Sequence, residues 1–230
     1  MNSLRFMFLS ALKISGYALY PSRLNWLSEE PDTWDDISLI LILNHTSLFE
    51  FVYGVTLPFG FLNQISKRLI IPVAESTLKK PLGGLVFNQL APKTIALSRK
   101  RDESWSEFLN QISREDICIF MPEGRMRRAD GLDKHGKALH VKSGVYELLN
   151  KFRGRKMLLV YSGGLHHVLA PGQVVPRVFR YVKAGIECLS VDEYLDSFEA
   201  SDQPWKDIAG DLDFRRDECL KNMGVHYDCH

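Results

Sequence analysis

A nearly continuous apolar run, ISLILIL at residues 37–43, limits the folds that are open to this chain. Apolar residues without alternation indicate a strand buried on both faces, and such strands occur mainly in parallel sheets that helices cover. The run leads directly into four polar residues at 44–47. The sequence therefore predicts an α/β protein with a buried strand that ends at a group of polar side chains.

The rest of the chain alternates between strand-like and helix-like patterns. Further strands are predicted at residues 68–75, 94–97, 116–121, 157–161, 174–183 and 185–190. Besides one at the N-terminus, helices are predicted at residues 46–57, 78–90, 103–113, 137–151, 191–199 and 205–221. This alternation predicts a mixed, mostly parallel sheet with helices on both faces. In such sheets ligands bind at the carboxyl ends of the strands, so the residues that follow the strands are the first candidates for a site.

Size and composition fit one globular domain and exclude other classes of protein. The chain has 230 residues, of which 45% are hydrophobic and 25% charged, so a sizeable core can form and a disordered chain is excluded. A net charge of +1 argues against a nucleic-acid-binding protein. The four cysteines have no metal or redox spacing and form no disulfide framework, which favours a reducing compartment.

Acidic and basic residues are distributed unevenly along the chain. Residues 187–230 carry 12 acidic and 4 basic residues, whereas residues 1–186 carry 25 basic and 16 acidic residues. A basic body with an acidic tail suits an anionic ligand or an anionic membrane surface. Ordinary solvated faces are the alternative interpretation.

The N-terminal residues 4–20 are the segment where targeting must be considered. Lys13 interrupts the apolar stretch and no cleavage site is convincing, so we expect no signal peptide. The stretch is also shorter than a membrane-spanning helix, which needs about 20 apolar residues. On a helical wheel one face carries Leu4, Met7, Ala11, Ile14 and Ala18, and the opposite face carries Asn2, Arg5, Lys13 and Gly16, with Leu9 as an exception. The apolar face can lie in a membrane interface or pack on the protein's own core, and the sequence leaves both open.

The strand at 37–43 ends at two side chains that can act as an acid–base pair. His45 and Glu50 are five residues apart, so a turn that begins near Thr46 can bring the carboxylate back to the imidazole. A carboxylate there fixes the tautomer of the ring and leaves the other nitrogen free to accept a proton. The alternative is a helix N-terminus with a structural histidine and an exposed glutamate. A zinc site that adds His166 and His167 is not expected, because no i, i+4 histidine pair supports it.

The strand at 116–121 also runs into an unusual segment. The residues that follow it include Pro122, Glu123, Gly124, Arg125, Arg127 and Arg128. Glycine lets the backbone approach a ligand closely, and neighbouring guanidiniums can bind a phosphate in bidentate fashion. The alternative is a polar turn in solvent.

In this order and spacing, the segments resemble the blocks of the glycerolipid/lysophospholipid acyltransferase superfamily, typified by the bacterial lysophosphatidic acid acyltransferases. The resemblance covers about residues 35–185. NHTSLFE (44–50) is similar to the first block, a histidine followed after four residues by an acidic residue. FMPEGRMRR (120–128) resembles the third block, GKALHVKSGVYELL (136–149) resembles the helix that follows it, and MLLVYSGG (157–164) stands at the fourth. Residues 74–102 resemble the second block, with matches at Glu75, Pro81, Gly84 and Arg99.

The chain departs from the family pattern at several positions. Glu50 stands where the family usually has aspartate. Arg125 and Met126 replace the threonine and arginine of the third block, so its basic character moves to Arg125, Arg127 and Arg128. The fourth block lacks its usual proline. The catalytic pair of the family is retained, while the region that would select the acceptor differs.

The resemblance implies an O-acyltransferase. Such an enzyme moves a fatty acyl group from acyl-CoA or acyl carrier protein to the free hydroxyl of a lysophospholipid-like acceptor. His45 would be the general base, and Glu50 would orient and support it. Neither a covalent intermediate nor a metal is required, and the acyl donor is a co-substrate rather than a cofactor. An acyl-CoA thioesterase-like hydrolase, and a non-catalytic lipid-binding protein on the same fold, remain alternatives.

The resemblance also implies binding residues, partners and a location. Arg99, Glu123 and Gly124 match positions that bind the acceptor, and Arg125 and Arg128 are additional candidates for its phosphate. The expected partners are the acyl donor, the acceptor lipid and a membrane surface, and the expected location is the cytoplasmic face of a membrane, peripheral or monotopic. The chain then divides into a membrane-surface helix and connector (1–34), an acyltransferase domain (35–190) and an acidic helical extension (191–230).

Overall fold

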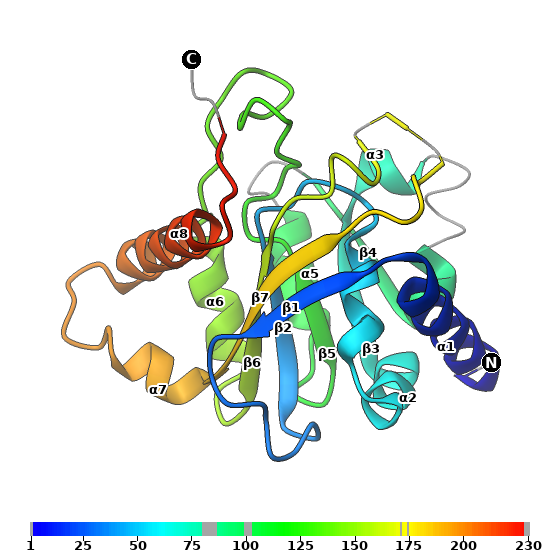
Figure 1. Cartoon of the computed structure of the whole chain (residues 1–230). Helices are drawn as coiled ribbons and strands as arrows, with labels where there is room; N and C mark the ends of the chain where they lie inside the picture. Colours follow the sequence, from blue (N-terminus) through cyan, green and yellow to red (C-terminus); the bar gives the residue numbers. More distant parts are fainter. Residues whose placement is uncertain (1, 80–86, 99–102, 171, 174, 228–230) are drawn as a thin grey trace.

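One sheet organises the protein. The computed structural model describes residues 2–79, 87–98, 103–170, 172–173 and 175–227, and Figure 1 shows their arrangement. Within these ranges, seven strands form a sheet in the order β1-β7-β6-β2-β5-β3-β4. The strands are β1 Ser22–Trp26, β2 Ile37–Leu43, β3 Leu69–Ala74, β4 Lys93–Leu97, β5 Ile117–Phe120, β6 Lys156–Ser162 and β7 Val182–Ser190.

Five of these strands run in one direction and two in the other. β2 pairs in parallel with both β5 and β6, and β3 pairs in parallel with both β4 and β5. β7 is antiparallel to β6, and β1 is parallel to β7 at the edge of the sheet. Every residue of β2 is buried, as its apolar run predicts. The predicted α/β class with a mixed, mostly parallel sheet is confirmed.

Helices cover both faces of the sheet (Figure 1). Alternate side chains of β2 belong to two separate clusters, Ile40 to the first and Leu41 to the second. The helices whose bounds the structure describes are α1 Asn2–Leu19, η1 Glu50–Thr56 (a 3-10 helix), α2 Phe59–Arg68, α3 Glu75–Leu78, α5 Glu103–Gln111, α6 Gly144–Lys151, α7 Val191–Asp196 and α8 Pro204–Asn222. The first cluster includes residues of α1, η1 and α2, and the second includes residues of α5, α6, α7 and α8.

Several predicted elements differ from the structure. The helix predicted at 137–151 begins only at Gly144, because tertiary partners take up the backbone groups before it: Asp213 accepts the N–H of Val141, and Arg127 donates to the carbonyl of Leu139. The strand predicted at 185–190 lies within β7, but the strand predicted at 174–183 is wrong for residues 175–181, which are not in a strand, because β7 begins only at Val182.

Two further differences concern the segments on either side of β2. The helix predicted at 46–57 is the shorter η1, since the N–H and hydroxyl of Thr46 bond to Glu50 and Leu165 instead of capping a helix. β1 was not predicted, and it joins the segment before residue 35 to the sheet. Part of the helix predicted at 78–90 lies outside the described residues.

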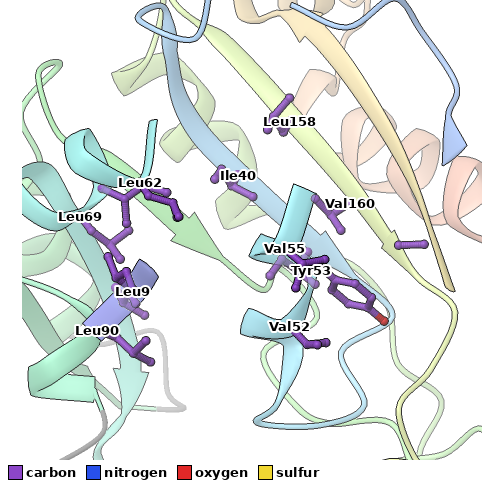
Figure 2. Packing of buried hydrophobic residues seen from close by; sticks show 14 of the residues in the cluster. Leu9, Ile40, Val52, Tyr53, Val55, Leu62, Leu69, Leu90, Leu158 and Val160 are labelled. Atoms are coloured by element: carbon purple, nitrogen blue, oxygen red, sulfur yellow. The ribbon is translucent and has the colours of Figure 1, made fainter. Parts of the chain in front are cut away.

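The N-terminal helix packs on the protein with the face that the helical wheel marks as polar. Arg5, Leu9 and Gly16 are buried, and a Cβ on Gly16 would lie 2.7 Å from Cγ1 of Val55, so this glycine lets α1 approach η1 closely. Figure 2 shows Leu9 in the first cluster with Leu62, Leu69 and Leu90, all in the buried core. The opposite, apolar face is exposed. Among the described helices, none has the length and hydropathy to cross a membrane.

Candidate active site

The carboxyl ends of three neighbouring strands meet at one edge of the sheet. β2 lies between β5 and β6 and is parallel to both, so these strands end side by side. The segments that leave them are residues 44–47, 121–124 and 163–165. This arrangement brings His45 and Glu123 together, although 78 residues separate them in the sequence. The interpretation of the two strand ends as one site is therefore supported by the fold.

Asn44 turns the chain at the end of β2. Its φ is 62°, in the left-handed region that asparagine tolerates better than most residues. Its side-chain amide donates to the carbonyl of Ser162 at 2.7 Å, and its Oδ1 accepts the hydroxyl of Tyr227 at 3.0 Å. The turn that carries His45 is thus joined to the end of β6 and to the C-terminal tail.

His45 and Glu50 form a buried hydrogen-bonded pair. The Nδ1–H of His45 donates to Oε2 of Glu50 at 2.5 Å, and Oε1 of Glu50 accepts the backbone N–H of Thr46 at 2.7 Å. Because an ionised carboxylate can only accept, the ring proton is on Nδ1 and Nε2 is the basic nitrogen. In the part of the chain that the structure describes, no side chain or backbone group bonds to Nε2. His45 is 9% exposed and Glu50 2%. The pair has the geometry of a general base oriented by a carboxylate.

Two opposing effects determine the basicity of this imidazole. Burial lowers the pKa of His45, because the charged ring loses its hydration. The charge and the hydrogen bond of Glu50, together with the charge of Glu123, outweigh burial and raise the pKa of His45 above its ordinary value. The surrounding carboxylates therefore stabilise the imidazolium that forms when Nε2 accepts a proton.

Glu123 contacts the main chain of the turn rather than the surface. This fully buried side chain accepts the N–H of His45 at 2.9 Å and the N–H of Asn44 at 3.2 Å. Its Oε1 also accepts Nη1 of Arg216 at 2.8 Å and Nη2 of Arg127 at 3.4 Å. Glu123 was predicted to bind the acceptor, and its contacts among the described residues are to the main chain of the histidine turn and to two arginines.

The other predicted binding residues lie in different environments. Gly124 and Arg128 are exposed, and Gly124 has a φ of 72° in the turn after β5. Arg125 donates to Asp133, and the backbone N–H of Lys137 and this guanidinium hold the pKa of Asp133 below its usual range. Arg99 lies outside the described residues, as do Pro81 and Gly84. Of the predicted set, the structure brings His45, Glu50 and Glu123 into one network.

Several residues that bond within the site lie outside the predicted set of catalytic and binding residues. The N–H of Arg127 donates to the carbonyl of His45 at 2.7 Å, and the hydroxyl of Tyr53 lies 2.7 Å from Oγ of Ser162 (Tyr53 is labelled in Figure 2). Arg216 comes from α8 and Tyr227 from the tail after it. The RMRR segment gave a local signal for Arg127. No local signal marks Arg216 or Tyr227, because their partners are far away in the sequence.

The two further histidines of the zinc site that was considered, His166 and His167, both bond to backbone carbonyls. His166 donates from Nε2 to the carbonyl of Arg127 at 2.7 Å, and His167 donates from Nε2 to the carbonyl of Tyr181 at 2.6 Å. Across the described ranges, no group of three or more His, Cys, Asp or Glu side chains is placed to hold a metal ion.

No family model matches the chain, and no curated protein matches it.

Proposed function

We propose that this protein is an O-acyltransferase, which transfers a fatty acyl group from acyl-CoA or acyl carrier protein to the free hydroxyl of a lysophospholipid-like acceptor. The observation that carries the proposal is the His45–Glu50 pair at the carboxyl end of β2, with its Nδ1–Oε2 distance of 2.5 Å. The four sequence blocks in their family order give the reaction class, and the pair supplies the chemical group that this class requires.

In the proposed reaction, Nε2 of His45 takes the proton of the acceptor hydroxyl while that oxygen attacks the carbonyl carbon of the thioester. The resulting tetrahedral intermediate breaks its C–S bond, so the ester stays on the acceptor. The departing thiolate takes the proton back from His45 and leaves as a free thiol. Because Glu50 raises the pKa of His45, it stabilises the imidazolium between the two proton transfers. The remaining contribution is positioning of the two substrates.

Exposed groups near the pair suit an acceptor with a phosphate. Gly124 and Arg128 follow Glu123 at the same edge of the sheet, and both are exposed. Arg128 has no ion pair with any residue that the structure describes, so it can donate to a phosphate directly, whereas Arg125 would have to leave Asp133. Arg128 is therefore the stronger candidate for the acceptor headgroup.

The outward face of α1 supports the proposed membrane surface as a partner. Leu4, Met7 and Ile14 are between 61% and 69% exposed. Arg5 and Lys13, expected to contact anionic lipid, point inward instead: Arg5 bonds to the carbonyls of Ser66 and Asn88, and Lys13 to that of Val55. The outward face is thus apolar, which suits insertion among lipid chains.

A second segment adjoins this face and adds positive charge. The N–H of Phe179 donates to the carbonyl of Leu19 at the end of α1, and the guanidinium of Arg23 lies 5.2 Å from the ring of Tyr181. Phe179 and Tyr181 are exposed, as are the cations Arg23, Arg177 and Arg180. An apolar face bordered by arginines fits an anionic bilayer, and we propose that the protein docks there on the cytoplasmic side.

The catalytic proposal is tested by incubating the protein with labelled acyl-CoA, with and without a panel of lysophospholipids, and identifying the lipid products by mass spectrometry. We expect acyl transfer to an acceptor, reduced by about 10²-fold or more in His45→Ala at unchanged thermal stability. His167→Ala, an exposed histidine away from the pair, is the control. Acyl-CoA consumption that needs no acceptor would indicate a hydrolase, and no consumption of either acyl-CoA or acylated carrier protein would indicate a lipid-binding protein.

The membrane proposal is tested by replacing Leu4, Met7 and Ile14 together with glutamine. These side chains are exposed, so the variant should keep its melting temperature but lose binding to phosphatidylserine-containing liposomes by about 10-fold or more. Removal of residues 1–20 would be less informative, because it also removes the buried Leu9. Phe214→Gln, on the exposed side of α8, should bind like the wild type. Unchanged co-sedimentation of the α1 variant would exclude this helix as the docking surface.

A further inference from the structure

The C-terminal extension reaches the histidine turn with a buried arginine. Arg216 lies on α8, whose residues Ile208 and Leu212 belong to the second core cluster. Its guanidinium is buried and points to the end of β5, where Nη1 donates to Oε1 of Glu123 at 2.8 Å. Glu123 in turn accepts the backbone N–H groups of Asn44 and His45. A continuous chain of bonds therefore links α8 to the main chain that carries the imidazole.

The charge of Arg216 is needed to keep this chain of bonds intact. A fully buried carboxylate is stable as an anion only when a cation and hydrogen-bond donors surround it. Arg127 also contacts Oε1 of Glu123, but at 3.4 Å, and its guanidinium bonds as well to the carbonyls of Gly131 and Leu139. Arg216 is the closer of the two cations. Without it, Glu123 would keep only the longer contact to Arg127 beside its two backbone N–H donors, and its position, with its hold on those N–H groups, would be less well fixed.

Other bonds hold Arg216 itself in place. Its Nη1 also donates to Oδ1 of Asp213 at 2.5 Å, and its Nε donates to Oδ1 of Asp217 at 2.8 Å. Asp213 has a second attachment, because its Oδ1 accepts the N–H of Val141 in the segment before α6. Two carboxylates of the acidic tail thus orient the guanidinium toward Glu123.

The tail after α8 contacts the same turn from another direction. The hydroxyl of Tyr227 donates to Oδ1 of Asn44, and the ring lies 5.3 Å from the guanidinium of Arg127. A Cβ on Gly131 would lie only 2.8 Å from Cβ of Tyr227, so the tail is packed closely against the loop that follows β5. Asn44 is therefore held in place through its side chain by Tyr227 and through its backbone N–H by Glu123.

We propose that Arg216 is a positioning residue for His45: through Glu123 it fixes the main chain of Asn44 and His45, so that the imidazole meets Glu50 and directs Nε2 to the reacting hydroxyl. The C-terminal extension is then part of the active centre rather than an appendage. The catalytic part of this inference rests on the proposed function, whereas the effect on the imidazole does not.

The test compares Arg216→Met with Arg215→Met. Arg215 is the neighbouring arginine on α8 and donates to Asp211 and Glu187, so its replacement also removes a cation and ion pairs but leaves Glu123 untouched. We expect Arg216→Met to lower kcat by about 10-fold or more with little change in KM for acyl-CoA, because displacement of a catalytic group affects the chemical step. Arg215→Met should retain the wild-type kcat.

A second readout follows the imidazole itself. The Nδ1–H of His45, in its short bond to Glu50, gives a downfield proton resonance, which His45→Ala assigns. This resonance should shift or disappear in Arg216→Met and stay in place in Arg215→Met. Wild-type kcat and an unmoved resonance in Arg216→Met, or equal effects of the two replacements, would overturn the proposal.

Arg216→Lys decides the question if Arg216→Met does not fold. It keeps a cation on α8 but loses the planar fork of donors that reaches Glu123, Asp213 and Asp217 together. It should move the same resonance and lower kcat several-fold, and an unchanged resonance with unchanged kcat would overturn the proposal. The resonance is measured without substrate, so it tests the positioning role even if the wild-type protein transfers no acyl group.

Discussion

Two buried glutamates lie on either side of His45, and they act on different parts of it. Glu50 contacts the imidazole through one oxygen and one backbone N–H through the other. Glu123 contacts two backbone N–H groups and two guanidiniums. The charge of Glu123 is largely balanced by arginine, whereas that of Glu50 is directed at the imidazole. Glu50 bonds to the ring itself and Glu123 only to the main chain, so Glu50 contributes more than Glu123 to the raised pKa of His45.

Burial and charge alone do not identify a carboxylate that would take part in catalysis. The role of a buried carboxylate depends on its nearest partner. A carboxylate paired with an imidazole stabilises a charge that appears during the reaction, and a carboxylate paired with arginine holds structure in place.

Glu50→Gln should have the largest effect of the three replacements that probe this comparison. We expect kcat to fall by about 10²-fold, with a smaller effect on acceptor binding. Because Glu50 raises the pKa of His45 and burial lowers it, the amide should let this pKa fall. The neutral base then persists to lower pH, so the acidic limb of the pH–rate profile should move to lower pH.

Glu50→Asp is the matched variant for this test. It keeps the charge and has the residue that the family usually carries, so it should retain more activity than Glu50→Gln. A silent Glu50→Gln variant would contradict the role of the pair, although His45 could still act alone.

Glu123→Gln should have an intermediate effect on kcat, about 10-fold, and a large effect on stability. The replacement removes the carboxylate that Arg127 contacts and leaves Arg216 with Asp213 and Asp217 alone, which we expect to cost about 3 kcal/mol in the free energy of unfolding, measured in urea. Glu115→Gln, at the other end of β5, removes an exposed ion pair to Arg155 and should cost less than about 1 kcal/mol. If Glu123→Gln and Glu115→Gln were equally stable, Glu123 would not have the structural role that distinguishes it from Glu50.

Arg128→Ala should have the smallest effect and a different kinetic signature. Arg128 is exposed at the edge of the site, so its loss should raise KM for a phosphate-bearing acceptor by about 3-fold and leave kcat nearly unchanged. Arg114→Ala, an exposed arginine before β5, is the control. A fall in kcat without a change in KM would assign Arg128 to the buried network instead of the surface.

Elements with a strong local pattern were predicted well from the sequence. The run at 37–43 coincides with β2, and the helix predicted at 205–221 is within one residue of α8 at each end. The pairing of His45 with Glu50 also followed from local spacing, because η1 begins at Glu50 and returns its carboxylate to the turn. β1 was missed because it is short and has no buried residue, and its place at the edge depends on β7.

The orientation of α1 shows why hydrophobicity alone was insufficient. The helical wheel ranks faces by polarity, and it marks the face with Arg5 and Gly16 as the outward one. Packing instead depends on shape: Gly16 permits contact with Val55, and Arg5 reaches carbonyl groups that need a donor. The face that packs is therefore the one that fits its neighbours.

The sequence by itself determined the α/β class and the buried central strand, because each depends on periodicity, and it gave the pair of His45 and Glu50 as one of two interpretations of their five-residue spacing. Only the tertiary structure decided the role of Glu123 and the presence of Arg216 and Tyr227 at the site. Arg216 and Glu123 are 93 residues apart, and no local pattern reports a bond across that distance. An arginine in an acidic tail is recognised as part of the site only when the fold places it beside a buried carboxylate.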